Sequence, residues 1–282
     1  MDYKIYNEKY LTLLSDYLNN HDCIITENMI NKVCDEGVND ERAFLLLFNQ
    51  IFLDSQDYIL KEKYLPFSFY KLNQEIYKEN PYYKNITFNN YKYKKWVLKK
   101  DKYRPYQGFV CNDFRCLEDG RIIPQIGYFD KPFHYLAIYQ NQRMWMSITP
   151  NEIETMKEPI NMANGNVLTF GLGLGYFAYM VSLKECVNKV IIVEKDNNVI
   201  DLFKNVILPQ FRFKDKILII NEDAFTFLND KENLNEINFV FCDIWHDVED
   251  GLDLYLKFKH YENDFPNIKF TYWIEKTIKA YL

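Results

Sequence analysis

Three glycines, Gly171, Gly173 and Gly175, alternate in the run VLTFGLGLGYFAYM at residues 167–180. Both flanks of this turn are strongly apolar, as expected for a buried strand that leads into a helix. Glycine adopts backbone conformations that other residues avoid, and it lets a ligand approach the main chain closely. The first N–H groups of the following helix would point at that ligand. The turn is therefore a candidate binding site, and a purely structural tight turn is the alternative.

Acidic residues follow the next three apolar runs of the chain. Glu194 ends the run IIVEKD, Asp223 and Ala224 follow in NEDAF, and Asp243 closes the run FVFCDIW. Because the carboxyl ends of parallel strands share one edge of a sheet, these side chains are expected to lie near the glycine turn. Each acid taken alone is also compatible with a helix cap or a solvated strand end.

The last third of the chain alternates apolar runs with helical patterns, which predicts an α/β fold with a parallel sheet covered on both faces. A capping box is expected at Thr149 and Glu152, with Pro150 in the first helical position. The expected strands are 166–171, 189–196, 216–223, 237–245 and 267–274, and the expected helices are 149–164, 176–187, 197–208, 224–230 and 252–261.

The residue pattern divides the rest of the chain into two regions. Residues 1–104 read as a helical N-terminal domain, and residues 105–148 read as a small β segment that would cover the pocket. Residues 149–282 form the expected ligand-binding domain.

The G-x-G-x-G spacing resembles motif I of the class I S-adenosylmethionine-dependent methyltransferases. A dinucleotide fingerprint instead needs a third glycine at position 176, which is Tyr176 here. The resemblance covers roughly residues 150–275 and implies a Rossmann-like domain that binds S-adenosyl-L-methionine. We therefore expect a methyltransferase with an unidentified substrate, most simply a small molecule.

The resemblance also implies roles for individual residues. The glycine turn would hold the cofactor, Glu194 would accept hydrogen bonds from both ribose hydroxyls, and Asp243 would meet the methionine end and the substrate. Asp223 and Ala224 lie where the family holds adenine. Trp245 would stack on adenine or close the pocket, although a tryptophan after a strand also serves packing alone.

Three departures from the family pattern are visible. Thr169 stands where many members carry an acidic residue, two positions before the first glycine. The sequence ends at Leu282, after the fifth expected strand, so we expect a truncated sheet in the order 3-2-1-4-5. The fourth motif reads DIWHD and not the Asn-Pro-Pro-Tyr type that marks amino-methylation of bases.

Two other functions stay open. An aminopropyltransferase of the spermidine synthase type shares this sheet and uses decarboxylated S-adenosylmethionine. That family carries an aspartate where this chain has Leu174. The acidic run Asp243, Asp247, Glu249 and Asp250 would suit a polyamine cation, but the last three also fit the start of a helix, where negative charge is favourable. The other alternative is a non-catalytic cofactor-binding scaffold whose N-terminal helices recruit a protein.

Catalysis would need in-line positioning and a base. Asp243 and His246 are the candidate catalytic residues, with Asp243 or Asp247 orienting the imidazole. A histidine that merely forms hydrogen bonds is the alternative for His246, and His134 is a weaker candidate. No residues show metal-ligand spacing, so no metal is expected.

The basic stretch at residues 77–106 contains nine Lys and Arg against two acids and interleaves them with aromatics. Such a pattern would suit RNA, but the whole chain is rich in Tyr, Phe and Lys, and RNA binding is not favoured. The net charge of −6 also argues against a general nucleic-acid coat. The chain shows no signal-peptide layout, no apolar run of membrane length and no CxxC pair, so a cytoplasmic protein without membrane association is expected.

Overall fold

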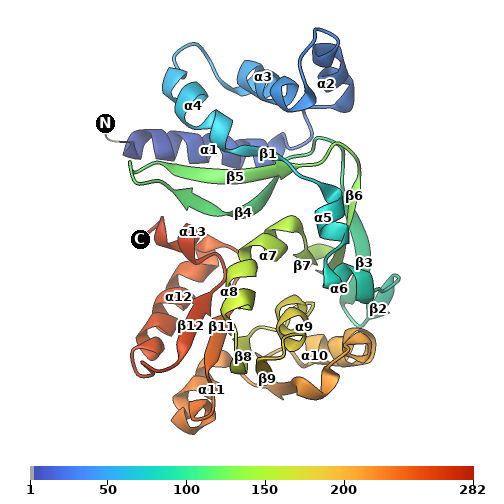
Figure 1. Cartoon of the computed structure of the whole chain (residues 1–282), viewed down its shortest axis with the longest axis vertical. Helices are drawn as coiled ribbons and strands as arrows, with labels where there is room; N and C mark the ends of the chain where they lie inside the picture. Colours follow the sequence, from blue (N-terminus) through green and yellow to red (C-terminus); the bar gives the residue numbers. More distant parts are fainter. Residues whose placement is uncertain (1–2) are drawn as a thin grey trace. The chain divides into compact units, whose positions relative to one another are not determined.

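A five-stranded sheet organises the C-terminal part of the protein. The computed structural model describes residues 3–282, and all neighbouring strands in this sheet pair in parallel (Figure 1). Its order is β10-β9-β8-β11-β12, which brings β8 to the centre. The expected α/β class with a parallel sheet is confirmed. The strands are β8 (Gly165–Phe170), β9 (Val187–Glu194), β10 (Ile217–Asn221), β11 (Phe239–Cys242) and β12 (Lys269–Tyr272).

Helices connect these strands at the expected places. The helix that follows the glycine turn begins directly after Gly175, and the longest one follows DIWHD. The segment 203–207 continues α10 as a π-helical turn before Pro209. The helices are α9 (Tyr176–Ser182), α10 (Asn197–Leu202), α11 (Ala224–Asn229), α12 (Val248–Glu262) and α13 (Glu275–Lys279).

The single helix expected over 149–164 is wrong. Two short helices, α7 (Pro150–Thr155) and α8 (Lys157–Met162), are separated at Met156. Pro159 explains the break, because its ring lacks an N–H and excludes the carbonyl group four residues earlier. The capping box is also wrong, since the Thr149 side chain makes no capping hydrogen bond. Glu152 is thereby left for another role.

A second sheet lies before the glycine turn in sequence, with the order β2-β3-β6-β7. The strands of this sheet begin at Tyr91, and β1 (Phe69–Lys71) begins earlier still, so both lie inside the region expected to be helical. The alternation of buried Trp96 and Leu98 with more exposed neighbours gives β3 its strand period. The elements are α6 (Pro81–Asn85), β2 (Tyr91–Tyr93), β3 (Trp96–Tyr103), β6 (Phe133–Gln140) and β7 (Arg143–Ile148).

The chain forms two compact units. One comprises Lys78–Lys100 and Leu136–Leu282, and the other comprises Met1–Tyr77 and Asp101–Tyr135. The division of the sequence at residues 104 and 148 stays a prediction.

The unit that contains the N-terminal helices has an aromatic core of its own. Phe44 stacks on Tyr128 with ring centroids 4.1 Å apart, and both side chains are buried. A three-stranded sheet in the order β1-β5-β4 completes the unit. Its elements are α1 (Lys4–Asn20), α2 (Glu27–Cys34), α3 (Asp40–Phe52), α4 (Tyr58–Lys63), β1 (Phe69–Lys71), α5 (Gln74–Lys78), β4 (Phe109–Cys116) and β5 (Ile122–Tyr128).

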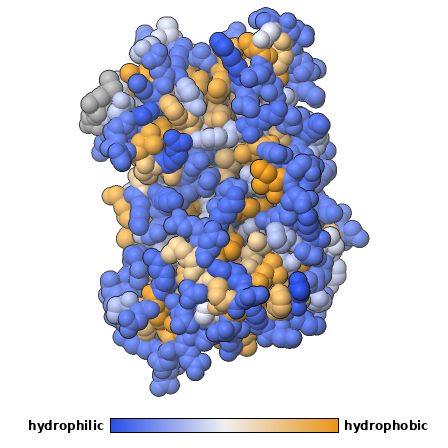
Figure 2. Space-filling view, viewed as in Figure 1, coloured by the Kyte–Doolittle hydropathy of each residue, from blue (hydrophilic) through white to orange (hydrophobic). Residues whose placement is uncertain are grey.

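The surface seen in Figure 2 is mostly hydrophilic, with hydrophobic side chains in small groups. Within residues 3–282, no helix combines the length and the apolar character needed to cross a bilayer.

Tyr82 on α6 supports the glycine turn, because its buried hydroxyl donates to the carbonyl oxygen of Leu174. We expect Tyr82→Phe to lower the free energy of unfolding by about 1–2 kcal/mol, since the buried carbonyl loses its donor. Chemical denaturation measures the change. The control is Tyr91→Phe, whose ring is 37% exposed and which should be neutral. Equal stabilities of the two variants would contradict the prediction.

Candidate functional site

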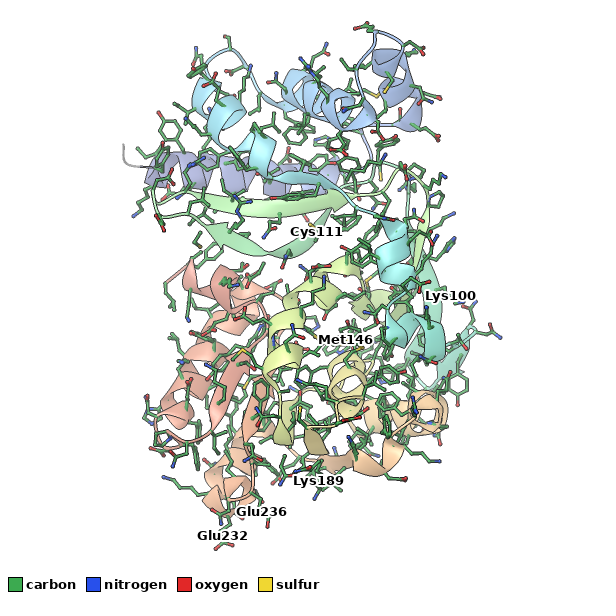
Figure 3. The ribbon with its side chains drawn as sticks, viewed as in Figure 1. Lys100, Cys111, Met146, Lys189, Glu232 and Glu236 are labelled. Atoms are coloured by element: carbon green, nitrogen blue, oxygen red, sulfur yellow. The ribbon has the colours of Figure 1, made fainter. Side chains whose placement is uncertain are left out.

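Close packing determines why the turn after β8 contains three glycines. All three have positive φ, +94° at Gly171, +50° at Gly173 and +72° at Gly175. A Cβ atom at Gly171 would collide with the carbonyl oxygen of Asp243, and one at Gly173 would collide with the sulfur of Met146. Met146 lies on β7 beside this turn (Figure 3). The glycines therefore serve the packing of the turn as well as any ligand.

The protein itself uses most amide groups of the turn. The Gly171 amide donates to the Val193 carbonyl at 3.0 Å, and the Gly175 amide donates to the Leu172 carbonyl at 2.8 Å. The amide of Leu172 donates to Glu194 Oε2 at 3.1 Å. The amide of Leu174 donates to the Met146 sulfur at 3.2 Å. Among described residues the Gly173 amide has no acceptor, so one amide of the five is available to a ligand.

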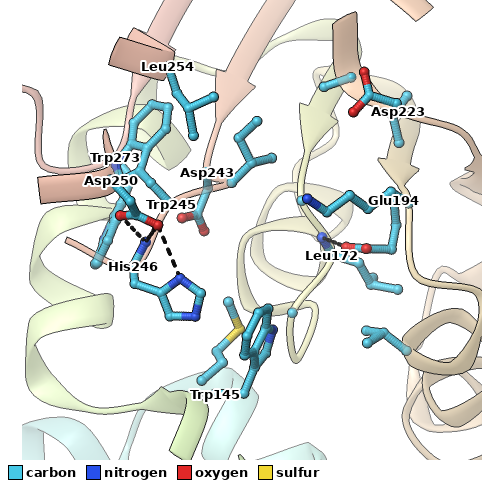
Figure 4. A pocket seen from close by; sticks show the side chains of 18 of the residues that line it. Trp145, Leu172, Glu194, Asp223, Asp243, Trp245, His246, Asp250, Leu254 and Trp273 are labelled. Atoms are coloured by element: carbon cyan, nitrogen blue, oxygen red, sulfur yellow. Dashed lines mark hydrogen bonds and ion pairs between the residues drawn. The ribbon is translucent and has the colours of Figure 1, made fainter. Parts of the chain in front are cut away.

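A cavity of about 340 Å³ opens at the carboxyl ends of the parallel strands. Figure 4 shows Glu194 and Asp223 on one side, and Asp243 with His246 on the other. Gly175 is the exception among the residues named from the sequence, because it lines a small neighbouring cavity instead. The structure thus brings together eight of the nine: Gly171, Gly173, Glu194, Asp223, Ala224, Asp243, Trp245 and His246.

The two acids expected at the nucleoside end already make hydrogen bonds. Glu194 accepts from the amides of Leu172 and Asp196, and burial raises its pKa although both amides oppose the shift. Asp223 caps α11, because its Oδ1 accepts from the amides of Phe225 and Thr226. Asp223 Oδ2 accepts no hydrogen bond within the described residues. The helix-cap alternative therefore holds for Asp223, while one oxygen stays available.

A second pair of acids, Asp243 and Glu152, faces the same cavity. Burial raises the pKa of Asp243 to about 7. Burial also raises the pKa of Glu152 far above its usual range, and the charge of Asp243 adds to this shift. Within residues 3–282, neither carboxyl group forms a hydrogen bond or an ion pair. A cation from outside the protein would relieve this repulsion.

The orientation of His246 differs from the expectation. The expected partner was Asp243 or Asp247, but Asp250 Oδ2 lies 3.4 Å from His246 Nδ1. Asp247 instead caps α12, with its Oδ1 accepting from the amide of Glu249 at 2.8 Å. The reason is geometric, because the first turn of α12 folds Asp250 back over the loop. His246 also makes an edge contact with the ring of Trp145, with centroids 4.3 Å apart.

Trp245 is buried and packs against Gly251, where a Cβ atom would lie 2.9 Å from its ring. Its indole N–H is buried and makes no hydrogen bond within the described residues. This placement agrees with the packing alternative, and a cofactor contact stays a prediction. His134 does not line the cavity.

Sequence reasoning missed several lining residues. Glu152 was visible but was interpreted as part of a capping box, and Asp250 was interpreted as a charge at a helix start. Nothing in the sequence pattern indicated that Trp145, Met146, Leu254 and Trp273 reach the cavity.

The basic stretch at 77–106 owes its aromatics largely to packing. Tyr82 and Trp96 are fully buried and cannot stack on bases. The Lys94 ammonium donates to Asn198 Oδ1 at 2.7 Å, and the Lys99 ammonium lies over the ring of Tyr139. These contacts favour a structural role, which is the role that the sequence favoured over RNA binding.

The geometry can now be compared with known proteins. Residues 152–264 match the family model of the spermine/spermidine synthase domain. No curated protein matches the chain. The matched range begins at Glu152 and includes the glycine turn, Glu194, Asp223 and Asp243. The match points to a transferase function of the aminopropyltransferase type or to a related function on the same fold. It gives no support to methyl transfer specifically.

Glu194 provides a first test of the nucleoside end. We expect Glu194→Ala to weaken S-adenosylhomocysteine by about 2–3 kcal/mol, because a charged acceptor is lost, while the fold survives. Isothermal titration calorimetry measures the affinity. The exposed Glu185, just before β9, gives the control Glu185→Ala, which removes the same charge without this loss. Unchanged binding by Glu194→Ala would show that the assignment is wrong.

The raised pKa of Asp243 predicts a pH-dependent stability. The folded state holds the proton up to about pH 7, whereas the unfolded state releases it near its ordinary pKa of about 3.8. The stabilisation is therefore complete below about pH 4 and is lost as the pH rises to about 7. Between pH 5 and 8 we expect this group to lower the free energy of unfolding by about 2–3 kcal/mol. Urea denaturation of the protein and of Asp243→Asn measures the difference, and parallel pH slopes would contradict it.

Proposed function

We propose that this chain is an aminopropyltransferase-type enzyme that binds decarboxylated S-adenosylmethionine and an amine acceptor. One observation carries the proposal. Asp243 and Glu152 face the cavity without a cationic partner among the described residues. A ligand with an ammonium group and no carboxylate would neutralise this pair.

The other lining residues support a cationic ligand. Six of them are acids, Glu152, Glu194, Glu222, Asp223, Asp243 and Asp250, whereas Lys195 is the one lysine. Lys195 is exposed and pairs with none of these acids. With a single free amide in the glycine turn, a ligand carboxylate would find few donors and much repulsion. The decarboxylated form avoids both costs.

We expect the two sides of the cavity to bind different parts of the ligand. Glu194, Asp223 and Ala224 would hold the nucleoside at the carboxyl ends of a Rossmann-like sheet in the order 3-2-1-4-5. Asp243 and Glu152 would hold the ammonium group. A bound sulfonium supplies an already activated alkyl carbon, so the protein has to orient the acceptor amine and remove its proton. His246 is the proposed proton acceptor.

Methyl transfer from S-adenosyl-L-methionine is the second candidate function. Leu174 favours it, because aminopropyltransferases of the spermidine synthase type carry an aspartate at that position. Glu152 on α7 weakens this preference, because it lines the same small cavity as Leu174. Glu152 could therefore supply the carboxylate that the aspartate provides in aminopropyltransferases.

Calorimetry with four ligands tests the proposal. We expect decarboxylated S-adenosylmethionine to bind more tightly than S-adenosylmethionine, and NAD to bind weakly. Glu152→Gln should weaken the decarboxylated ligand about tenfold or more, because a charged hydrogen bond is lost. Binding of adenosine, which lacks the ammonium group, should not change.

The matched control is Glu154→Gln on the same helix, because Glu154 pairs with Lys157 at 2.6 Å and does not line the cavity. Tighter binding of S-adenosylmethionine, together with an unaffected Glu152→Gln variant, would favour methyl transfer. Ligand binding without turnover of any amine would favour the scaffold.

A further inference from the structure

Asp250 holds both the main chain and the ring of His246. Its Oδ1 accepts from the amides of His246 at 3.0 Å and Asp247 at 3.1 Å, and its Oδ2 lies 3.4 Å from His246 Nδ1 (Figure 4). Two backbone amides therefore fix the carboxylate independently of the ring. This arrangement differs from a mobile surface ion pair, in which both side chains must be ordered to meet.

The chemistry of the pair determines the state of the ring. A carboxylate only accepts hydrogen bonds, whereas a neutral imidazole has one nitrogen that donates and one that accepts. With Asp250 next to Nδ1, the proton of the neutral ring belongs on Nδ1. Nε2 then keeps its lone pair.

We infer that Asp250 is a positioning residue that fixes neutral His246 in the Nδ1–H tautomer, with Nε2 as the proton acceptor of the site. The edge contact with Trp145 limits rotation of the ring. When an acceptor ammonium group transfers its proton to Nε2, its nitrogen gains a lone pair and the ring becomes an imidazolium. The new positive charge lies beside Asp250, which stabilises it. The proton donor named here rests on the proposed function, but the tautomer does not.

Nitrogen NMR measures the tautomer directly, without any ligand. The chain has four histidines, so the ring signals in long-range 1H–15N spectra can be assigned, with His246→Gln identifying His246. At a pH where the ring is neutral, we expect His246 to carry its proton mainly on Nδ1. In Asp250→Asn, the amide oxygen can keep the two backbone hydrogen bonds while the NH2 group faces Nδ1. That variant should therefore shift His246 to the Nε2–H tautomer.

Asp247→Asn is the matched control for the tautomer. Asp247 also lies at the start of α12 and caps it, but within residues 3–282 its side chain forms no hydrogen bond or ion pair with the His246 ring. The wild-type tautomer should persist in this variant. A wild-type ring protonated on Nε2 would overturn the inference, whether or not Asp250→Asn folds. The same tautomer in folded Asp250→Asn and in the wild type would also overturn it.

Turnover provides a second, separable measurement. We expect Asp250→Asn to lower kcat about tenfold because the ring is misoriented, and to change KM less, because Asp243 and Glu152, the pair proposed to hold the ammonium group, are retained. Asp253→Asn removes the same charge from an exposed site on α12 and should retain activity. If decarboxylated S-adenosylmethionine does not bind at all, the proposed function fails while the tautomer result stands. If turnover of Asp250→Asn equals that of the wild type, the positioning role fails.

Discussion

The cavity depends on close packing around the turn after β8. Gly171 lies against the main chain of Asp243, Gly173 against the sulfur of Met146, and Gly175 against the ring of Phe203. A side chain at Gly171 or Gly173 would separate β8 from β11 or displace β7, and one at Gly175 would displace Phe203, since protein interiors leave no room for added atoms. The same contacts bring Asp243 and Glu194 to opposite sides of the turn. The packing of the glycine turn therefore also determines where the carboxyl groups of Asp243 and Glu194 lie.

That placement has an electrostatic consequence. Carboxylates in a cavity repel one another, and desolvation penalises each charge, so the Asp243–Glu152 pair favours protonation in the absence of a cation. A ligand that brings positive charge replaces this repulsion with attraction. Under the proposed function, this charge preference would distinguish decarboxylated S-adenosylmethionine from its carboxylated parent.

The residues at the start of α12 cap the helix and also contact His246 at the cavity. Asp247 and Asp250 form a reciprocal capping box, which satisfies the amide groups that a helix start leaves unpaired. Asp250 also reaches the ring of His246, so the residue that stabilises the helix also orients the candidate base. A short loop between β11 and α12 makes both contacts available to one side chain.

Local patterns in the sequence determined the strands and helices of the last third and the cluster of Gly171, Glu194, Asp223 and Asp243, because strand ends in a parallel sheet must meet. The position of Trp245 at this cavity was also predictable, because this residue follows the expected strand that became β11. Tertiary structure alone decided the partners of these residues. Glu152 read as a capping residue, and its place beside Asp243 depends on the break at Met156 and on the packing of α7. Likewise, β3 lies within residues 1–104, which were expected to form a helical domain, and the burial of Trp96 and Leu98 on this strand requires neighbouring strands. Sequence spacing reports neighbours along one element, whereas burial and charge partners arise from elements that are distant in the chain.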